Sequence, residues 1–173
     1  RPGSITSPLL DHCPASLPAT AYYSADTYAH EIERIWRRNW IYAGRLNDLP
    51  PATIRRLDVA GQNLILVRDR EGAVTCFHNS CRHRGSELCS AQEKPLNSKV
   101  IVCPYHQWSF ATDGRLVSVG HASPTGDFDK TAHGLFKVHL NLWNGFIFVC
   151  LADEPPLFAE SPDLGVHALD NWP

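Results

Sequence analysis

CRHRGSELC (residues 81–89) and CPYHQW (residues 103–108) each place one cysteine and one histidine a few positions apart. The four candidate metal ligands are Cys81 and His83 in the first stretch and Cys103 and His106 in the second. Thiolates and imidazoles bind zinc, copper and iron–sulfur centres. Because turn-forming residues accompany both stretches, the sequence predicts two metal-binding loops at the tips of hairpin-like connections.

The mixture of ligand types within each loop bears on which metal is bound. A single zinc ion could accept two cysteines and two histidines, but zinc fingers normally draw both thiolates from one segment and both imidazoles from another. A 2Fe-2S cluster with one iron on two cysteines and the other on two histidines explains the mixture, because each loop then spans both irons. The spacing therefore favours a Rieske-type cluster, with zinc as the alternative.

Composition sets the broad class of the protein. With 173 residues, 43% of them hydrophobic, the chain can bury one ordinary core. A net charge of -2 gives no overall basic field of the kind that attracts nucleic acid. No apolar run approaches the roughly 18 residues of a membrane span. We therefore expect a cytoplasmic protein with neither nucleic-acid nor membrane partners.

The six cysteines are not expected to form a disulfide framework. Cys76 and Cys150 lie inside apolar, strand-like runs and should be small core residues. Cys13 belongs to an N-terminal tail, and Cys89 is interpreted as a bystander of the metal site. Only Cys81 and Cys103 are thus predicted to bind metal.

The rest of the sequence predicts a mainly β fold of antiparallel sheets. Short apolar runs bounded by turn residues predict strands at 53–59, 63–69 and 73–79, with further strand pairs within 107–119 and 135–152. Hairpin turns are expected at residues 60–62, 70–72, 113–114 and 144–145. These turns join neighbouring strands in the antiparallel sense.

One α-helix is predicted within residues 24–40. Ser24 is a favourable N-cap, and Tyr28 and Ile35 recur at the three-four spacing of one helical face. Aromatic residues at this spacing usually lie in a core, so Trp36 and Trp40 are expected to be buried.

The segments CRHRG and CPYHQWSF, with DGRL just downstream, resemble the N-terminal domain of the oxygenase (alpha) subunit of Rieske non-heme iron ring-hydroxylating-type oxygenases. The segments CRHRGSELCSA, CPYHQW and HGL are most similar to the subgroup that attacks quaternary ammonium compounds such as glycine betaine, choline or carnitine. The gap between the two ligand pairs is slightly longer than is usual in that family. EKPLNSK (residues 93–99) is expected to form the additional surface loop.

The resemblance implies an electron-transfer function. Such a domain accepts electrons from an NAD(P)H-dependent flavin reductase or a ferredoxin. It passes them to a mononuclear non-heme Fe(II) in a catalytic domain, for O2-dependent hydroxylation or demethylation. The full-length oxygenase is expected to be a homotrimer. A stand-alone Rieske-type ferredoxin, acting only as an electron carrier, is the alternative.

The family also implies roles for residues beside the ligands. Arg84 could stabilise the reduced cluster or dock a partner's carboxylate, and Gly85 fits a tight turn. Tyr105 and Trp108 would cover the cluster and exclude water. These four residues are the predicted surroundings of the cluster.

No sequence pattern for the mononuclear iron is recognisable. Four histidines outside the loops are expected to be isolated polar residues: His121, His133, His139 and His167. We therefore expect no substrate turnover by this chain alone. The predicted organisation is an extended arm (1–21), a helix and lead-in (22–45), the Rieske 2Fe-2S domain (46–155) with cluster-binding loops at 79–110, and a linker toward an absent catalytic domain (156–173).

Overall fold

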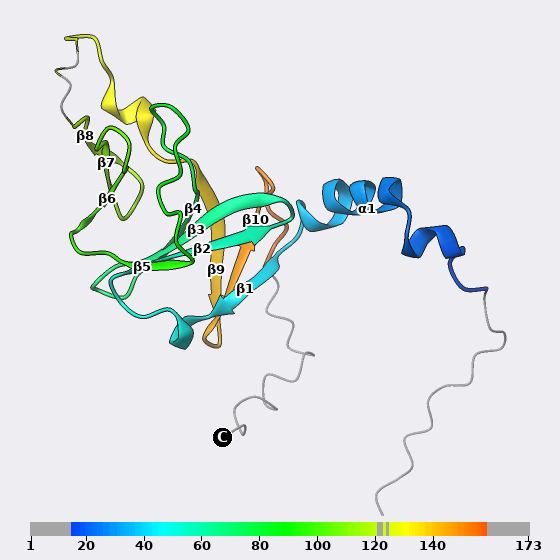
Figure 1. Cartoon of the computed structure of the whole chain (residues 1–173). Helices are drawn as coiled ribbons and strands as arrows, with labels where there is room; N and C mark the ends of the chain where they lie inside the picture. The colour runs from blue at the N-terminus through cyan, green and yellow to red at the C-terminus, as the bar shows by residue number, and fades with distance from the viewer. Residues whose placement is uncertain (1–14, 121–122, 124, 159–173) are drawn as a thin grey trace, which may run out of the picture.

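A computed structural model describes residues 15–120, 123 and 125–158 (Figure 1). A seven-stranded sheet has the order β1 (Ile41–Arg45), β10 (Phe146–Cys150), β9 (Lys137–Trp143), β4 (Val74–His78), β3 (Gln62–Arg68), β2 (Thr53–Val59) and β5 (Glu93–Pro95). A three-stranded sheet contains β6 (Val100–Val102), β7 (Ser109–Ala111) and β8 (Leu116–Ser118). The neighbouring strands pair antiparallel, which confirms the predicted mainly β fold.

Two tight hairpins form where the sequence predicts them. Ala60 and Gly61 join β2 to β3 with φ of 48° and 75°, and Asn144 and Gly145 join β9 to β10 with φ of 45° and 77°. Positive φ at both central residues is the mark of the type I′ turn, whose twist matches that of the flanking strands. Local sequence thus determines the register of both strand pairs.

Strand β3 separates two groups of buried side chains. Successive side chains of a strand point to opposite faces of the sheet. Ile65 and Val67 contribute to the core beneath the candidate metal loops, whereas Leu64 and Leu66 contribute to the core shared with β9 and β10. All four are fully buried. The sheet is therefore covered on both faces along this strand.

Three strands were not predicted. Strand β1 pairs with β10 through a register shift near Gly44, which lies within the predicted lead-in. Strands β5 and β6 are only three residues long, too short for an alternating pattern to be recognised. The interpretation of residues 93–99 as a surface loop is wrong for Glu93–Pro95, which pairs with β2. Proline is tolerated there because β5 is an edge strand.

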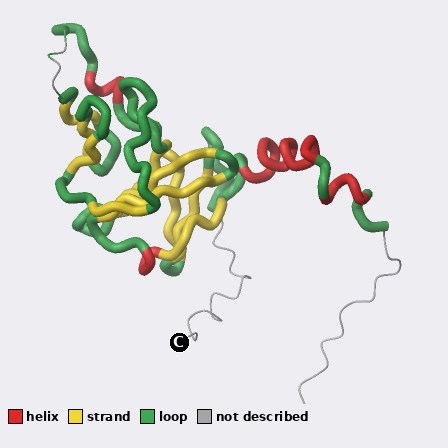
Figure 2. Tube along the Cα trace, in the orientation of Figure 1, coloured by secondary structure: helices red, strands yellow, loops and turns green. Residues whose placement is uncertain are grey.

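The helix projects away from both sheets (Figures 1 and 2). It consists of α1 (Ala25–Glu31) and a π-helical turn, η2 (Ile32–Trp36), and Ser24 caps it by accepting a hydrogen bond from the Thr27 amide at 3.4 Å. A 3₁₀ turn at Ala19–Tyr22 precedes it. Across the parts of the chain that the structure describes, no helix has the length and apolar character needed to cross a membrane.

The prediction that the helix buries its tryptophans is wrong for Trp36, which is 47% exposed. The reason is the position of the helix, which projects away from both sheets (Figure 1) and also leaves Tyr28 and Ile35 exposed. Trp40, at the base of the helix, is partly buried. Its indole N–H donates to the Pro156 carbonyl at 2.8 Å, and its ring meets Phe158 edge to face at 5.2 Å.

The structure confirms Cys76 and Cys150 as core residues, since both are fully buried. Burial raises the pKa of the Cys76 thiol to about 12, so this group stays protonated and inert at neutral pH. Cys13, His121 and His167 lie outside the described residues. The predictions made for these three therefore remain predictions.

Replacing Leu66 with alanine should lower the free energy of unfolding by about 2–5 kcal/mol, because it opens a cavity in a fully buried part of the core. The matched control is Leu142→Ala on β9, where the side chain is 42% exposed. The measurement is the urea midpoint followed by far-ultraviolet circular dichroism. Equal losses in the two variants would contradict the burial described for β3 on both faces of the sheet.

Candidate metal centre

The first loop follows β4 and closes on itself through the backbone. The Cys81 amide donates to the Ser86 carbonyl at 2.9 Å, and the Gly85 amide donates to the Cys81 carbonyl at 2.9 Å. Gly85 has a φ of 69°, in the left-handed region that glycine adopts at little cost. The glycine thus permits the tight turn that carries Cys81 and His83.

The second loop, between β6 and β7, repeats this arrangement. The Cys103 amide donates to the Trp108 carbonyl at 2.8 Å, and the Gln107 amide donates to the Cys103 carbonyl at 3.1 Å. Gln107 has a φ of 59°, so it holds the same backbone position as Gly85 despite its side chain. The two loops therefore have one turn geometry, although their histidines follow the cysteines by two and three positions.

The structure brings all four predicted ligand residues together. The rings of His83 and His106 lie 4.8 Å apart between centroids, at 72° to each other. The thiols of Cys81 and Cys103 lie within hydrogen-bonding contact, and these two cysteines are only 3% and 2% exposed. The cysteines are thus buried, whereas His106 is partly exposed and His83 is exposed.

The surroundings of Cys81 suit a bound thiolate. Burial, together with the neighbouring Cys103 thiol, raises the pKa of the Cys81 thiol to about 11. The backbone N–H groups of His83 and Arg84 donate to its sulfur and act in the opposite direction. Hydrogen bonds to sulfur are one of the means by which proteins tune iron–sulfur potentials. A metal at this position would convert the thiol into a thiolate that two amides already support.

His106 provides the most direct test of fit. Its Nδ1 atom is buried and has no hydrogen-bond partner among the described residues. An unsatisfied buried polar atom costs about 1–3 kcal/mol, so such atoms call for a specific explanation. Coordination of a metal through Nδ1 would supply the missing partner. The donor set and the orphaned nitrogen therefore fit a metal cluster held between the loops.

The geometry does not converge on a single ion. Within residues 15–120, 123 and 125–158, no group of three or more histidine, cysteine or carboxylate side chains could hold one metal ion. A binuclear cluster needs fewer protein ligands at each metal, since each iron takes only two. The arrangement in pairs is compatible with that requirement.

The residues predicted to surround the cluster differ in exposure. Trp108 is 7% exposed and stacks on His83, whereas Tyr105 is 60% exposed and lies against His106 with ring centroids 3.7 Å apart. Arg84 is exposed, and its charge is one of the causes that lower the pKa of His83, after burial and His106. Trp108 therefore covers one face of the His83 ring, whereas Tyr105, beside His106, is open to solvent.

Asn79 is a buried residue whose importance the sequence did not reveal. Its side-chain oxygen accepts hydrogen bonds from the Leu88 and Cys89 amides, both at 3.0 Å, and its amide donates to the Cys89 carbonyl at 2.7 Å. Asn79 is only 3% exposed. It therefore fixes the chain after the first loop, and Cys89 contributes there through its backbone.

Gly120 is a second residue whose importance the sequence did not reveal. Its φ is 68°, and a Cβ atom added to it would lie 2.3 Å from the His106 carbonyl oxygen. The Gln107 carbonyl carbon would lie 3.2 Å away. Gly120 thus packs directly beneath the peptide that joins His106 to Gln107, and no larger residue fits.

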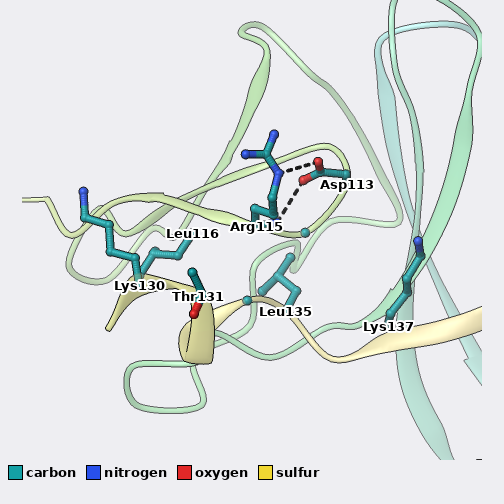
Figure 3. A pocket seen from close by; sticks show the side chains of 9 residues that line it. Asp113, Arg115, Leu116, Lys130, Thr131, Leu135 and Lys137 are labelled. Carbon is teal, nitrogen blue, oxygen red and sulfur yellow. Dashed lines mark hydrogen bonds and ion pairs between the residues drawn. The ribbon is translucent and has the colours of Figure 1, made fainter. Parts of the chain in front are cut away.

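A surface pocket lies beside the loops, at the β7–β8 turn (Figure 3). Three cationic side chains line it: Arg115, Lys130 and Lys137. Arg115 donates from Nε to the Asp113 carboxylate at 2.7 Å, and this contact holds the pKa of Asp113 below its usual range. Asp113 thus neutralises part of the charge. None of the four predicted metal ligands lines this pocket.

Substitution of Gly120 by alanine should displace the second loop and reduce the iron content of the purified protein several-fold. The matched control is Gly145→Ala, where φ is also positive but no atom lies within 4 Å of the added Cβ. The two variants share the backbone strain, so their difference reports the clash at His106. Iron and acid-labile sulfide are measured per chain. Equal iron loading in the two variants would contradict the packing described for Gly120.

The chain matches the family model of the Rieske [2Fe-2S] domain over residues 39–133. It is 40% identical over 142 residues to the glycine betaine monooxygenase oxygenase subunit of Chromohalobacter salexigens, covering 82% of this chain and 31% of that protein. The carnitine monooxygenase oxygenase subunit of Escherichia coli K12 is 31% identical over 161 residues, covering 91% of this chain and 42% of that protein.

Solved structures of similar fold support the same relationship. A quaternary ammonium Rieske monooxygenase in complex with L-carnitine aligns with a TM-score of 0.77 and 26% identity, covering 87% of this chain and 43% of that chain. Naphthalene 1,2-dioxygenase with indole bound aligns with a TM-score of 0.65 and 30% identity, covering 75% of this chain and 30% of that chain. The chain spans less than half the length of these relatives, and it belongs to the Rieske [2Fe-2S] domain family.

Proposed function

We propose that this chain is the electron-transfer domain of a multicomponent oxygenase, and that Cys81, His83, Cys103 and His106 hold its 2Fe-2S cluster. The observation that carries the proposal is the pairing of the two loops, which brings together two buried thiols and two neighbouring imidazoles and leaves the buried Nδ1 of His106 without a partner among the described residues. One thiolate and one imidazole from each loop would reach across both irons. The bound cluster would supply reversible one-electron chemistry.

The exposure of the site supports a role in electron transfer. His83 and Tyr105 are exposed on the surface of the loops, while both cysteines are buried. A cluster held there would have its cysteine-bound iron buried and its histidine-bound iron close to the surface. The buried side would be kept from water, and the histidine side would be close to a docked partner. Replacing two anionic thiolates by neutral imidazoles also raises the reduction potential relative to an all-cysteine ferredoxin.

The names of the relatives support the wider assignment. The glycine betaine and carnitine monooxygenase oxygenase subunits are more than twice as long as the aligned part of this chain. We propose that the full protein receives electrons from an NAD(P)H-dependent flavin reductase or ferredoxin and passes them to a mononuclear non-heme iron in a further domain. Quaternary ammonium compounds are the proposed substrates. The full-length oxygenase is proposed to be a homotrimer. In this organisation residues 156–173 lead toward that domain.

Replacing either His83 or His106 with alanine should abolish the Rieske electron paramagnetic resonance signal of the dithionite-reduced protein, because one iron loses a ligand. The matched control is His139→Ala, where the imidazole hydrogen-bonds the Asp153 carbonyl at 3.2 Å and lies on β9. The control should keep the signal of the unmodified chain. An unchanged spectrum in the His106 variant would contradict its assignment as a ligand.

The purified 173-residue chain should accept one electron from NADH through a flavin reductase without forming any oxidised quaternary ammonium product. Reduction is followed by bleaching of the visible absorption, and product by mass spectrometry. A colourless zinc-containing protein would exclude the cluster altogether. Product formation by the chain would show that it contains an oxygen-activating site of its own.

A further inference from the structure

We propose that Phe128 and His133 are positioning residues for the cluster: they hold the indole of Trp108 flat against the ring of His83. This inference rests on the proposed function, since it assigns His83 as a ligand. His133 was expected to be an isolated polar residue, and the structure instead places it beside the metal loops. The two loops would then be supported by a third segment, residues 125–136, which we call the supporting segment.

The contact between Trp108 and His83 is a parallel stack. The two ring centroids lie 4.8 Å apart, and the planes differ by only 8°. Trp108 is nearly buried, whereas His83 is exposed. The ring of His83 also meets His106 edge to face at 72°, but only the indole lies parallel to it, so the indole face defines the plane of the imidazole. The orientation of His83 therefore depends on the position of Trp108.

Trp108 is in turn held by two aromatic rings from the supporting segment. Phe128 meets it edge to face at 5.8 Å and 84°, and His133 meets it at 5.9 Å and 70°. Phe128 and His133 also stack on each other, with centroids 4.5 Å apart and planes 27° apart. Edge-to-face and offset-stacked pairs are the favoured aromatic arrangements. The four rings thus form one contiguous set from the surface turn to the candidate ligand.

The backbone of the supporting segment is itself fixed. His133 closes the 3₁₀ turn η4 (Lys130–His133), and its Nδ1 atom lies 2.7 Å from the Asp129 carbonyl oxygen. The Asp129 carboxylate caps the same turn by accepting from the Thr131 amide at 2.8 Å. The Leu135 amide donates to the Gly114 carbonyl at 2.8 Å. His133 therefore occupies a defined position and is not a freely rotating surface residue.

A second contact joins the supporting segment to the first loop. Arg82 lies between the two candidate ligands of that loop, and its guanidinium covers the ring of Phe136 at 3.8 Å. The same side chain donates to the Ala132 carbonyl at 3.3 Å. The first loop thus contacts the supporting segment directly through Arg82. It also contacts that segment indirectly, because His83 stacks on Trp108 and Trp108 packs against Phe128 and His133.

The arrangement predicts what loosening the supporting segment would do. If His133 or Phe128 is truncated, the indole gains freedom and the plane of His83 is no longer defined. The g values of the reduced cluster report ligand orientation, so they should shift and their lines should broaden. Water would also reach a cluster that gains negative charge on reduction, which favours the reduced form and raises the midpoint potential.

The test compares His133→Ala with His133→Phe, which preserves an aromatic ring at the same position. Each protein is first assayed for iron and sulfide, and then measured by electron paramagnetic resonance and redox titration. We expect broadened, shifted g values and a raised potential for His133→Ala, and a return toward the unmodified values for His133→Phe. His139→Ala serves as a histidine control away from the aromatic set and should change neither quantity.

A double-variant cycle tests whether His133 acts through Trp108. In a Trp108→Leu background, His133→Ala should produce no further shift, because the ring through which it acts is gone. Phe128→Leu keeps apolar volume but removes the ring, and it should give the same change as His133→Ala. If the His133→Ala protein does not load iron, Phe128→Leu is measured in its place. Spectra and potentials of both variants that match the unmodified protein, or a full His133→Ala shift that persists without Trp108, would overturn the inference. Absence of a Rieske signal from the unmodified chain would instead refute the proposed function.

Discussion

The backbone turn shared by the two loops is the constraint on which the candidate metal centre depends. In each loop the cysteine amide is bonded to the carbonyl five residues further on, and a residue of positive φ precedes that carbonyl. Gly85 fills this position without strain, whereas Gln107 does so against the usual preference of an L-residue. The second loop depends on a glycine elsewhere, since Gly120 packs under the His106–Gln107 peptide where no side chain would fit.

The sheets hold this pair of turns in place. Strand β4 leads into the first loop, and strands β6 and β7 flank the second. Phe77, on β4, is fully buried and belongs to the same core as Cys81 and Cys103. Its ring also lies against Gly114, where an added Cβ would come within 2.5 Å of it. Packing around one phenylalanine thus relates the first loop to the β7–β8 hairpin that continues from the second.

The sequence was sufficient for features that depend on local chemistry. The dipeptides at 60–61 and 144–145 predicted their hairpins, and Ser24 predicted the start of the helix, because turn and cap preferences act within a few residues. The spacing of cysteine and histidine predicted which four residues the fold would bring together. Cys76 and Cys150 were predicted as core residues from the apolar runs around them.

Features that depend on tertiary placement were missed. Trp36 was expected in a core because its helix is amphipathic, but periodicity does not say whether a sheet lies opposite. Strands β5 and β6 are too short to show a pattern, and the pairing partner of β5 is far away in sequence. Phe128 and His133 lie 20 and 25 residues beyond Trp108 in the sequence, so only the folded structure shows them beside it.

The most direct test of the metal centre counts the imidazoles bound to the reduced cluster. Pulsed electron paramagnetic resonance of the purified chain, grown with 15N-labelled histidine, measures the hyperfine coupling of directly coordinated nitrogens. Two distinct strongly coupled nitrogens are predicted, one from His83 and one from His106. A spectrum with no strongly coupled histidine nitrogen, or with only one, would contradict the mixed-ligand cluster.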